Sequence, residues 1–465
     1  MNDVVAVDHS AIYNSFARAL KPHLVDGAPA LAASDKASEF LADYIPDAGA
    51  FAIWAQEQSL GPIHSALIAD FLRSVGHAEA ALRLASRAFA AHPRDLSVGG
   101  LIEACRDTLY GAKKQKKSKF CVLPFEHFEI LPNGNVYLCC PGWLTQEIGN
   151  VNRSSWEDIW NSDAAKEIRA SIHDGSFRFC NPNLCPPLSS NTLPTAESVK
   201  KKSQRWAEIV DEQITHVTEG PEVVSLSNDS TCNLSCPSCR TGMIKAKDDV
   251  KAQLRKTAEE VVLPLLKHAQ RVSMLGAGDP FASQYARLIL KKLTPSEYPN
   301  LRVSIQTNGV LFDERAWSDL ELDGKIRNVI VSMDASTEDV YKVVRRGGDF
   351  KRLMENLQFL SRMRKAGKFD NLRLDCVVQW RNYRDLPGLI RIAEDLDADT
   401  VTFQAIYNWG TFSREDFLQE TITRPDHPEF SDFLTVLRDP VMSWDRIYWG
   451  TIDRFRKLAI SSQGV

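Results

Sequence analysis

The sequence predicts an α/β protein built on a partial (β/α)6 TIM-like barrel, with a small cysteine-rich domain and a helical region ahead of it. Three observations support this fold class: six strand-like runs alternate with helix-like runs after residue 220, cysteines gather before them, and the first residues have helical periodicity. Alternating strands and helices favour a parallel sheet whose right-handed crossovers curl it toward a barrel. A closed barrel needs eight repeats, so six predict an open one.

The alternation consists of apolar runs of strand length separated by runs with helical spacing of apolar residues. The strand-like runs cover residues 223–227, 271–275, 301–306, 328–333, 372–378 and 400–405. The helix-like runs cover residues 251–268, 283–293, 314–320, 338–344, 350–365 and 385–396. We therefore divide the chain into residues 1–112, 113–205, 206–410 and 411–465, of which the last part is expected to be mostly helical.

Composition and charge narrow the class of protein. The 465 residues suit two or three domains, and 44% hydrophobic with 25% charged residues is typical of a globular protein. A formal net charge of -4 gives no reason to expect nucleic acid or a membrane surface as partner. The first residues lack the pattern of a secretory signal, and no apolar run is long enough to span a bilayer. We expect a cytoplasmic protein.

The N-terminal region has one feature of a repeat protein. Residues 65–92 show helical spacing broken at Gly76, and their small-residue pattern is typical of a tetratricopeptide-like helix hairpin, carried by Leu72, Ala81, Ala88 and Pro93. A solenoid needs about three such units and only one is visible. The region is therefore a generic helical cap or a docking surface for a partner. The lysine-rich run 113–119 without aromatics indicates a solvated linker.

Five cysteines lie in residues 121–188. Without an export signal, clustered cysteines favour metal binding or catalysis over disulfides. Asn133 and Gly134, between strand-like runs, predict a hairpin within 128–140. A helix is expected over 155–171 with Ser154 or Ser155 as N-cap, and a linker over 189–205. The lone cysteines Cys105 and Cys376 are expected to be buried apolar residues.

A second cysteine motif directly follows the first strand of the barrel, as Cys232, Cys236 and Cys239. An electron-transfer [4Fe–4S] cluster takes four thiolates, so three in one loop leave one iron open for a substrate. Loops after barrel strands line the face where active sites lie. Zinc is the alternative, but it prefers four N or S ligands, and the nearest histidines, His216 and His268, lie outside the loop.

The spacing Cys-x3-Cys-x2-Cys after the first of six strands resembles the radical S-adenosylmethionine superfamily. Residues 277–280 resemble the stretch of that family that holds the methionine amino group, and 307–309 resemble its Thr-Asn-Gly stretch. Ser238 stands where the family usually has an aromatic residue against the adenine. The resemblance implies cofactor contacts at Ser238, Gly278, Asp279, Pro280, Thr307, Asn308, Ser332 and Asp334, the last two at the ribose.

The chemistry that this resemblance implies belongs to the cofactors. The open iron would bind S-adenosylmethionine, and one electron would cleave it to a 5′-deoxyadenosyl radical that abstracts hydrogen from a peptide, protein or sugar-like small molecule. The implied partners are S-adenosylmethionine and an electron donor such as flavodoxin or ferredoxin. The alternative function is a non-catalytic iron–sulfur or zinc scaffold that binds a partner protein.

The first cysteine group resembles a SPASM domain with one auxiliary [4Fe–4S] cluster. The resemblance implies ligation by Cys121, Cys139, Cys180 and Cys185, with Cys140 as an alternative to Cys139, and zinc on four cysteines stays open. Such a cluster would relay an electron from the product radical or shape the substrate pocket. This domain usually follows the barrel, whereas here it precedes it.

Six further residues are candidates for substrate contact. Arg345 and Arg346 either grip an anionic substrate by bidentate contacts or form a solvated turn. The others follow the fifth and sixth strands and are Trp380, Asn382, Gln404 and Tyr407.

Overall fold

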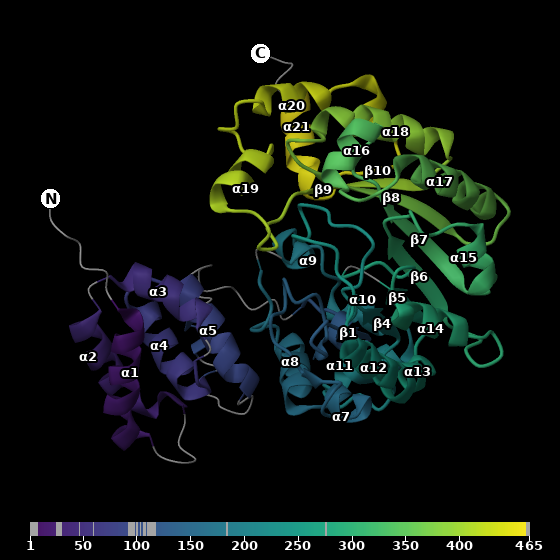
Figure 1. The fold of residues 1–465 in the computed structure, drawn as a ribbon. Coiled ribbons are helices and arrows are strands. Elements are labelled where there is room, and N and C mark those ends of the chain that lie inside the picture. The colour runs from purple at the N-terminus through teal and green to yellow at the C-terminus, as the bar shows by residue number, and fades with distance from the viewer. Residues whose placement is uncertain are drawn as a thin grey trace. The chain divides into compact units, whose positions relative to one another are not determined.

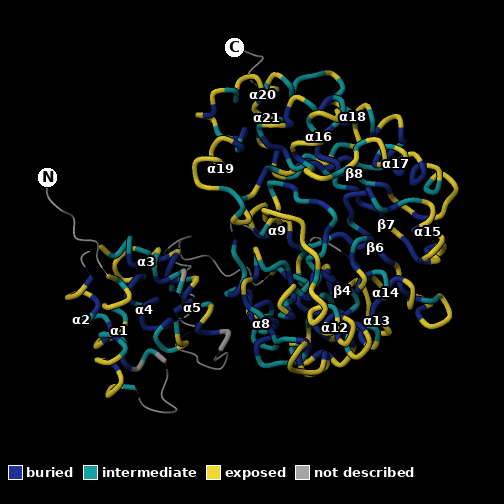
Figure 2. Tube along the Cα trace, viewed as in Figure 1, coloured by how far each residue is buried: buried dark blue, intermediate teal, exposed yellow. Residues whose placement is uncertain are grey.

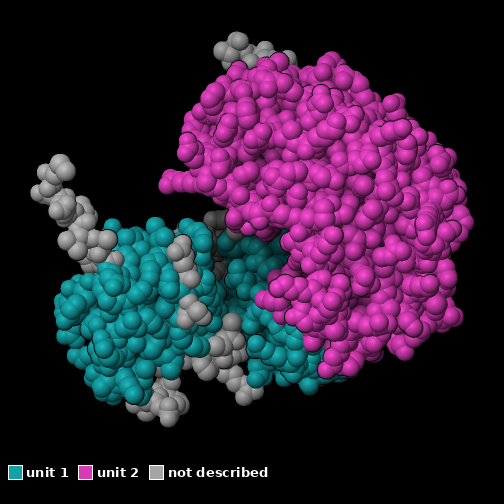
Figure 3. Space-filling model, in the orientation of Figure 1, with its two compact units in different colours: residues 1–129, 135–220 teal, residues 130–134, 221–465 magenta. Residues whose placement is uncertain are grey.

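The computed structural model describes residues 8–24, 30–45, 47–58, 60–91, 118–182, 185–274 and 277–461, together with 98, 101–102, 104–105 and 108. It divides into two compact units (Figure 3). Unit 1 comprises residues 1–129 and 135–220, and unit 2 comprises residues 130–134 and 221–465. Pro93, Leu275 and residues 113–117 lie outside the described residues, so the expectations placed on them stay predictions.

The first part of unit 1 is helical, as expected. Helices α4 (Pro62–Ser74) and α5 (Ala78–Ala91) form the predicted hairpin, with Gly76 in the turn between them at φ +94°, a conformation that glycine adopts without strain. Leu72, Ala81 and Ala88 are buried in it. The other elements are α1 (His9–Leu20), η1 (Lys21–His23), η2 (Ala30–Ala33), α2 (Ser34–Tyr44) and α3 (Ala48–Glu57) (Figure 1).

The cysteine-rich part of unit 1 combines short strands with short helices. Gly134, at φ +83°, closes the predicted turn between β1 (His127–Ile130) and β2 (Asn135–Tyr137), and β2 pairs antiparallel with β3 (Gly149–Asn150). The remaining elements are η3 (Leu123–Phe125), α7 (Trp156–Trp160), α8 (Asp163–His173), α9 (Pro186–Ser189), α10 (Ala196–Lys200) and α11 (Gln204–Asp211). The expected linker over 189–205 thus contains α10 and the beginning of α11.

The single helix expected over 155–171 is two helices. Ser155 caps α7 and Ser162 caps α8, each accepting a hydrogen bond from a backbone N–H of the first turn. Between them Asn161 turns its side chain to Val217, accepting from its N–H at 2.9 Å and donating to its carbonyl at 2.9 Å. The tertiary contact of Asn161 therefore competes with helix continuation, which helical periodicity alone does not reveal.

Arg169 ties this part of unit 1 together. Its buried guanidinium donates to the carbonyls of Pro124 and Thr215 at 2.9 and 2.8 Å, and to Asn161 Oδ1 at 3.1 Å. It also lies over the ring of Trp160, 4.3 Å from the centroid. Burial lowers its pKa to about 9. One side chain from α8 thus joins segments more than forty residues apart in sequence.

Unit 2 is built on a parallel sheet. Its described strands lie in the order β10-β9-β8-β7-β6-β5-β4, and every neighbouring pair is parallel. Six of them match the predicted runs, and β10 is a short strand that the sequence did not indicate. The strands are β4 (Val223–Leu226), β5 (Arg271–Met274), β6 (Arg302–Thr307), β7 (Ile326–Ser332), β8 (Asn371–Val378), β9 (Thr400–Ala405) and β10 (Ile447–Tyr448). This confirms the predicted fold class.

Helices follow the strands as crossovers (Figure 1). The helix expected over 251–268 contains a π-helical segment, η4 (Ala258–Val262), between α12 (Asp248–Thr257) and α13 (Leu263–Leu266). The others are α14 (Gln284–Lys292), α15 (Glu314–Asp319), α16 (Glu338–Val344), α17 (Phe350–Lys365), η5 (Tyr383–Asp385), α18 (Leu386–Asp395), α19 (Arg414–Glu420), α20 (Phe430–Val436), η6 (Pro440–Ser443), η7 (Gly450–Ile452) and α21 (Asp453–Ser461). None of the helices that the structure describes has the length and apolar character of a membrane span.

Burial alternates along the strands and separates the two faces of the sheet (Figure 2). In β8, Leu372, Leu374, Cys376 and Val378 are buried, whereas the residues between them are more exposed. The buried face packs against helices such as α17. The opposite face is therefore the inner face of the partial barrel, and the strand ends lead to it.

Candidate active site

The loop after β4 carries the three-cysteine motif. Backbone hydrogen bonds fold it: Cys239 and Arg240 both donate from N–H to the carbonyl of Cys236 at 2.9 Å, and Cys232 donates to the carbonyl of Ile244 at 3.0 Å. Cys232 and Cys236 are buried, at 8% and 5% exposure, while Cys239 is exposed. One sulfur of the motif therefore faces open space, and the other two lie at the base of the loop.

Each of the three sulfurs has a side-chain nitrogen of its own nearby. Asn308 Nδ2 lies 3.8 Å from Cys232 Sγ, Arg345 Nη1 lies 3.8 Å from Cys236 Sγ, and Arg240 Nη2 lies 3.3 Å from Cys239 Sγ. These donors come from the ends of β6 and α16 and from the loop itself. Donors and positive charge near sulfur stabilise the thiolate form that binds metal.

Burial and these donors act in opposite directions on the thiols. Burial raises the pKa of Cys232, while the N–H of Leu234 and the charge of Arg240 lower it. Burial likewise raises the pKa of Cys236, and the guanidinium of Arg345 opposes it. The nearby donors therefore offset part of the rise in thiol pKa that burial causes. This favours ligation by iron, which requires the thiols to ionise.

The segment after β5 is fitted closely against this loop. A Cβ on Gly278 would lie 2.4 Å from the carbonyl oxygen of Thr231 and 2.5 Å from that of Asp229, so only glycine fits there. The N–H of Asp279 donates to Thr231 O at 2.8 Å. The predicted residues Gly278 and Asp279 thus meet the cysteine loop, and Pro280 is buried beside them.

Asp279 joins this segment to the end of β6. Its carboxylate accepts from Thr307 Oγ1 at 2.7 Å, from Asn308 N–H at 2.8 Å and from Phe281 N–H at 3.0 Å. Asn308 in turn donates to Asn233 Oδ1 at 2.9 Å. Burial raises the pKa of Asp279, and these hydrogen bonds oppose the increase. The Asp279 carboxylate thus joins the segment after β5 to the end of β6, and cofactor contact by its oxygens stays a prediction.

Asp334, at the end of β7, has φ +61° and a carboxylate engaged on both oxygens. Arg345 Nε forms an ion pair with Oδ2 at 2.8 Å, and the N–H of Val377 donates to Oδ1 at 2.8 Å. The side chains of Asp334 and Arg345 are 2% and 13% exposed. A ribose contact by Asp334 would compete with Arg345. Arg345 itself neither grips a substrate nor lies in a solvated turn, as the sequence suggested, because it is buried between Asp334 and Cys236.

The remaining predicted cofactor contacts, Ser238 and Ser332, are held less tightly by other side chains. Ser238 is half-buried in the cysteine loop. Ser332 lies on the inner face, where its Oγ accepts from Gln306 Nε2 at 3.4 Å. In register with Ser332 stand Asp375 and then Thr402, and Arg373 pairs with Asp375 at 2.7 Å. The inner face near the strand ends is therefore polar and carries a charge pair.

Trp380 and Asn382 hold structure together. Trp380 Nε1 donates to Glu429 Oε1 at 2.8 Å, which anchors the C-terminal helices. Asn382 Nδ2 donates to the carbonyls of Asp334 and Val377 at 2.7 and 2.9 Å. Gln404 is exposed, and Tyr407 is 64% exposed and packs edge-on against Trp409. Only Gln404 and Tyr407 stay available as substrate contacts among these four.

In the cysteine-rich part of unit 1, thiols face one another. Burial raises the pKa of Cys139, and the neighbouring Cys121 and Cys180 raise it further. Burial also raises the pKa of Cys121 to about 11, and Cys185 adds to the increase. Burial raises the pKa of Cys140 as well, and Glu129 adds to the increase. Cys139 is thus affected by Cys121 and Cys180 and, as the smallest contribution, by Cys140.

The family comparisons agree with these two sites. Residues 121–186 match the SPASM family model, described as an iron–sulfur cluster-binding domain, and residues 230–371 match the radical SAM superfamily. The chain carries a radical SAM domain preceded by a SPASM domain. The predicted domain order is confirmed, and the radical SAM domain is typical of enzymes. No curated protein matches the chain.

Solved structures resemble this chain weakly. SuiB of Streptococcus suis bound to S-adenosylmethionine is 17% identical, with a TM-score of 0.30 over 46% of this chain and 45% of that one. SuiB bound to the precursor peptide SuiA is 13% identical, with a TM-score of 0.34 over 69% and 70%. Native anSMEcpe with bound AdoMet is 20% identical, with a TM-score of 0.33 over 46% and 58%. The chain thus spans less than two thirds of the first and last of these.

The donor sets fit the cofactors of the family. A radical SAM domain binds a [4Fe–4S] cluster and S-adenosylmethionine, and a SPASM domain binds auxiliary iron–sulfur clusters. As they stand, no three His, Cys, Asp or Glu side chains within the described ranges converge closely enough to hold a metal ion. Thiols are nonetheless the ligands that iron–sulfur clusters use, and both proposed ligand sets consist of thiols. Neighbouring thiols disfavour one another's ionisation, and a cationic cluster would neutralise the charge of the resulting thiolates.

Proposed function

We propose that Cys232, Cys236 and Cys239 hold the [4Fe–4S] cluster at which S-adenosylmethionine is cleaved, and that the enzyme removes a hydrogen atom from a peptide or sugar-like substrate. When bound, the two cofactors supply a 5′-deoxyadenosyl radical. The observation that carries the proposal is the three-thiol loop, into which the segments after β5, β6 and β7 all fit. We further propose Cys121, Cys139, Cys180 and Cys185 as ligands of the auxiliary cluster.

The residues around the loop support this role through position and charge. Asp279 and Asn308 fix the loop against two strand ends, so its sulfurs keep one orientation when the substrate binds. Arg345, Arg240 and Asn308 direct nitrogens at the sulfurs. Hydrogen bonds to the sulfurs help to set the reduction potential of an iron–sulfur cluster, and this one has to accept an electron.

The inner face supports a polar substrate. Ser332, Thr402 and the Arg373–Asp375 pair stand in neighbouring strands on that face. Burial raises the pKa of Asp375 and Arg373 opposes it, so the pair offers both a donor and an acceptor. Hydroxyl or amide groups of a sugar-like molecule or a peptide match such a lining, because buried polar groups need partners.

The test is anaerobic reconstitution with iron and sulfide, followed by dithionite and S-adenosylmethionine. We expect about eight irons per chain and 5′-deoxyadenosine from the wild type. Cys232→Ala/Cys236→Ala/Cys239→Ala should retain about four irons and form no 5′-deoxyadenosine. Cys139→Ala should lose the auxiliary iron, whereas the matched control Cys140→Ala should keep it, because Cys140 is not one of the four proposed ligands.

Other outcomes point elsewhere. A full iron content with no 5′-deoxyadenosine from the wild type, with or without candidate peptides and sugars, would indicate a non-catalytic scaffold. Zinc in place of iron after aerobic and anaerobic preparation alike would remove the basis of the proposal. Equal iron loss from Cys139→Ala and Cys140→Ala would contradict the proposed auxiliary ligands.

A further inference from the structure

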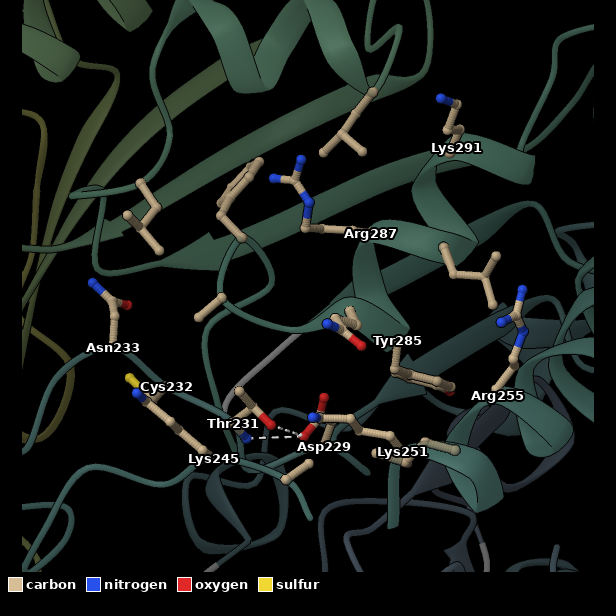
Figure 4. Close-up of a pocket in the computed structure, with 18 of the residues that line it drawn as sticks. Asp229, Thr231, Cys232, Asn233, Lys245, Lys251, Arg255, Tyr285, Arg287 and Lys291 are labelled. Carbon is tan, nitrogen blue, oxygen red and sulfur yellow. Dashed lines mark hydrogen bonds between the residues drawn. The ribbon is translucent and has the colours of Figure 1, made fainter. Parts of the chain in front are cut away.

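A wide groove in unit 2 runs from the cysteine loop along the outer helices. Its volume is about 1180 Å³, and it lies between the loop, α12, α14 and the end of α15 (Figure 4). Cys232 and Asn233 are part of its wall at one end. The groove therefore reaches from a proposed cluster ligand to the protein surface, and none of the roles assigned above uses it.

The groove is positively charged although the chain is acidic overall. Five cations line it, namely Lys245, Lys251, Arg255, Arg287 and Lys291, against two carboxylates, Asp229 and Asp319. Asp229 accepts from Thr231 and Ser283, and Asp319 pairs with Arg315 at 3.6 Å. A chain with a net charge of -4 thus concentrates positive charge beside the cysteine loop.

Three of the cations are not neutralised by the protein. Lys251 pairs with Asp248 and Arg255 with Glu259, each on the same stretch of chain. In the part of the chain that the structure describes, Lys245, Arg287 and Lys291 make no ion pair. Unpaired cations around a groove attract an acidic partner and accelerate its association.

The arrangement favours a protein surface over a small anion. Figure 4 shows the five cations standing apart around the groove, from the loop, from α12 and from α14, and not converging on one point. Between them lie apolar side chains, including Met243, which is 53% exposed, and Phe281. Separated charges around an apolar floor match the composition of protein interfaces.

The side of the sheet on which the groove lies decides what binds there. A substrate must reach the inner face at the strand ends, whereas α12 and α14 belong to the outer, helix-covered side. A partner in the groove would contact the cysteine loop without occupying the substrate position. Such a partner suits electron delivery, which needs proximity to the cluster and no access to the reacting carbon.

We propose that this groove docks an acidic one-electron carrier protein with a flavin or iron–sulfur centre. The reduced carrier loses one electron, the cluster held by the Cys232 loop gains it, and no bond forms or breaks in this step. This inference rests on the proposed cluster site. It assigns the partner surface of that site to Lys245, Arg287 and Lys291.

The test compares two triple charge reversals in the reconstituted full chain. The groove variant is Lys245→Glu/Arg287→Glu/Lys291→Glu. The matched control is Arg271→Glu/Lys351→Glu/Lys365→Glu, which reverses the same charges at exposed positions that make no ion pair within the described residues. Cluster reduction is followed by absorbance and electron paramagnetic resonance, with reduced flavodoxin or with dithionite as reductant, at low and high salt.

At low salt we expect flavodoxin to reduce the cluster of the groove variant at least about tenfold more slowly than that of the wild type. The control variant should stay near wild type, both variants should react normally with dithionite, and high salt should slow the wild type. An unchanged flavodoxin rate in the groove variant, or an equal decrease in the control, overturns the proposal. The proposal is also overturned if the cluster of the groove variant is reduced at the normal rate while the variant binds poly-glutamate more weakly. That result would assign the groove to acidic peptides.

This readout separates the two proposals. Reduction of the cluster is observed without S-adenosylmethionine, so it reports on docking even if no 5′-deoxyadenosine forms. Failure of cleavage with dithionite in the wild type contradicts the proposed function alone. Failure of flavodoxin to discriminate between the variants, with cleavage intact, contradicts the docking surface alone.

Discussion

The two cysteine groups differ in how much chain lies between their ligands. The loop after β4 holds three cysteines between residues 232 and 239, whereas the four proposed auxiliary ligands are spread from 121 to 185. Binding a cluster to the first group closes only short loops. Binding one to the second cross-links segments that are otherwise free to separate in the unfolded chain. The first group thus depends on the fold around it, and the second helps to create the fold.

The groups also differ in what surrounds the sulfur atoms. Arg240, Arg345 and Asn308 approach the loop sulfurs with one nitrogen each, whereas Cys121, Cys139 and Cys180 chiefly face other thiols. A site surrounded by hydrogen-bond donors, two of them cationic, is suited to a cluster that gains and loses charge. A site of mutually facing thiols is suited to permanent ligation.

The largest effect should appear when the ligands of one group are removed. In the chain-entropy account, the loops 121–139 and 139–180 each contribute roughly 3–4 kcal/mol, and the short loops within 232–239 roughly 2 kcal/mol each. The loop 180–185 adds roughly 2 kcal/mol. Cys121→Ala/Cys139→Ala/Cys180→Ala/Cys185→Ala should therefore lower the unfolding free energy of residues 118–220 by roughly 9 kcal/mol, against roughly 4 kcal/mol near the loop for the triple variant.

Hydrogen exchange with mass spectrometry checks this, because it reports unfolding free energies segment by segment. The auxiliary variant should lose protection across α7, α8 and α11, while β5 to β9 keep theirs. If both variants lost the same protection in the same segments, the two groups would not differ in the way argued above.

A smaller effect should follow from replacing Arg345, which belongs to the loop group only. Arg345→Gln leaves Asp334 buried without its cation, and breaking such a pair costs about 3 kcal/mol. It also removes positive charge from Cys236, so the cluster potential should become more negative. Redox titration followed by electron paramagnetic resonance measures the potential, and chemical denaturation measures stability.

Two variants separate these roles of Arg345. Asp334→Asn/Arg345→Gln removes both charges, and Asn tolerates the positive φ of residue 334, so stability should return. The potential should return part of the way, because the charge of Asp334 opposes that of Arg345 at Cys236. Arg346→Gln is the matched control, because Arg346 contacts Ser235 and Thr241 but no sulfur. An unchanged potential in Arg345→Gln, or an equal shift in Arg346→Gln, would refute the role given to Arg345.

Sequence could predict the parallel strands and the meeting of their ends, because strand periodicity and order determine which loops share an edge. The family resemblance singled out Gly278, Asp279 and Asn308, and the strand order places the loops that carry them beside the cysteine loop. The two-residue strand β10 has too few residues to show a period. The break at Asn161 depends on Val217, which is distant in sequence.

The hydrogen-bond and ion-pair partners of individual side chains could not be predicted in the same way. Asp334 and Arg345 lie at opposite ends of one crossover, and nothing in their spacing says that they pair or that Arg345 also reaches Cys236. Trp380 resembled a substrate contact because of its place after β8, yet its partner is Glu429 in the C-terminal helices. Such pairings follow from packing between elements, which local patterns do not encode.

The smallest stability effect, with the most local consequence, is expected at Gly278. The loop is not held by long cross-links, so its place depends on close contact with the segment after β5. Gly278→Ala would put a Cβ 2.4 Å from Thr231 O and 2.5 Å from Asp229 O, and such overpacking costs about 1–3 kcal/mol. The displaced loop should lose its iron and 5′-deoxyadenosine formation, while the auxiliary iron stays.

Gly242→Ala is the control and should behave as wild type, because nothing lies within 4 Å of a Cβ added there. Equal iron loss in both variants, or retention of loop iron in Gly278→Ala, would mean that the loop holds its position without this contact.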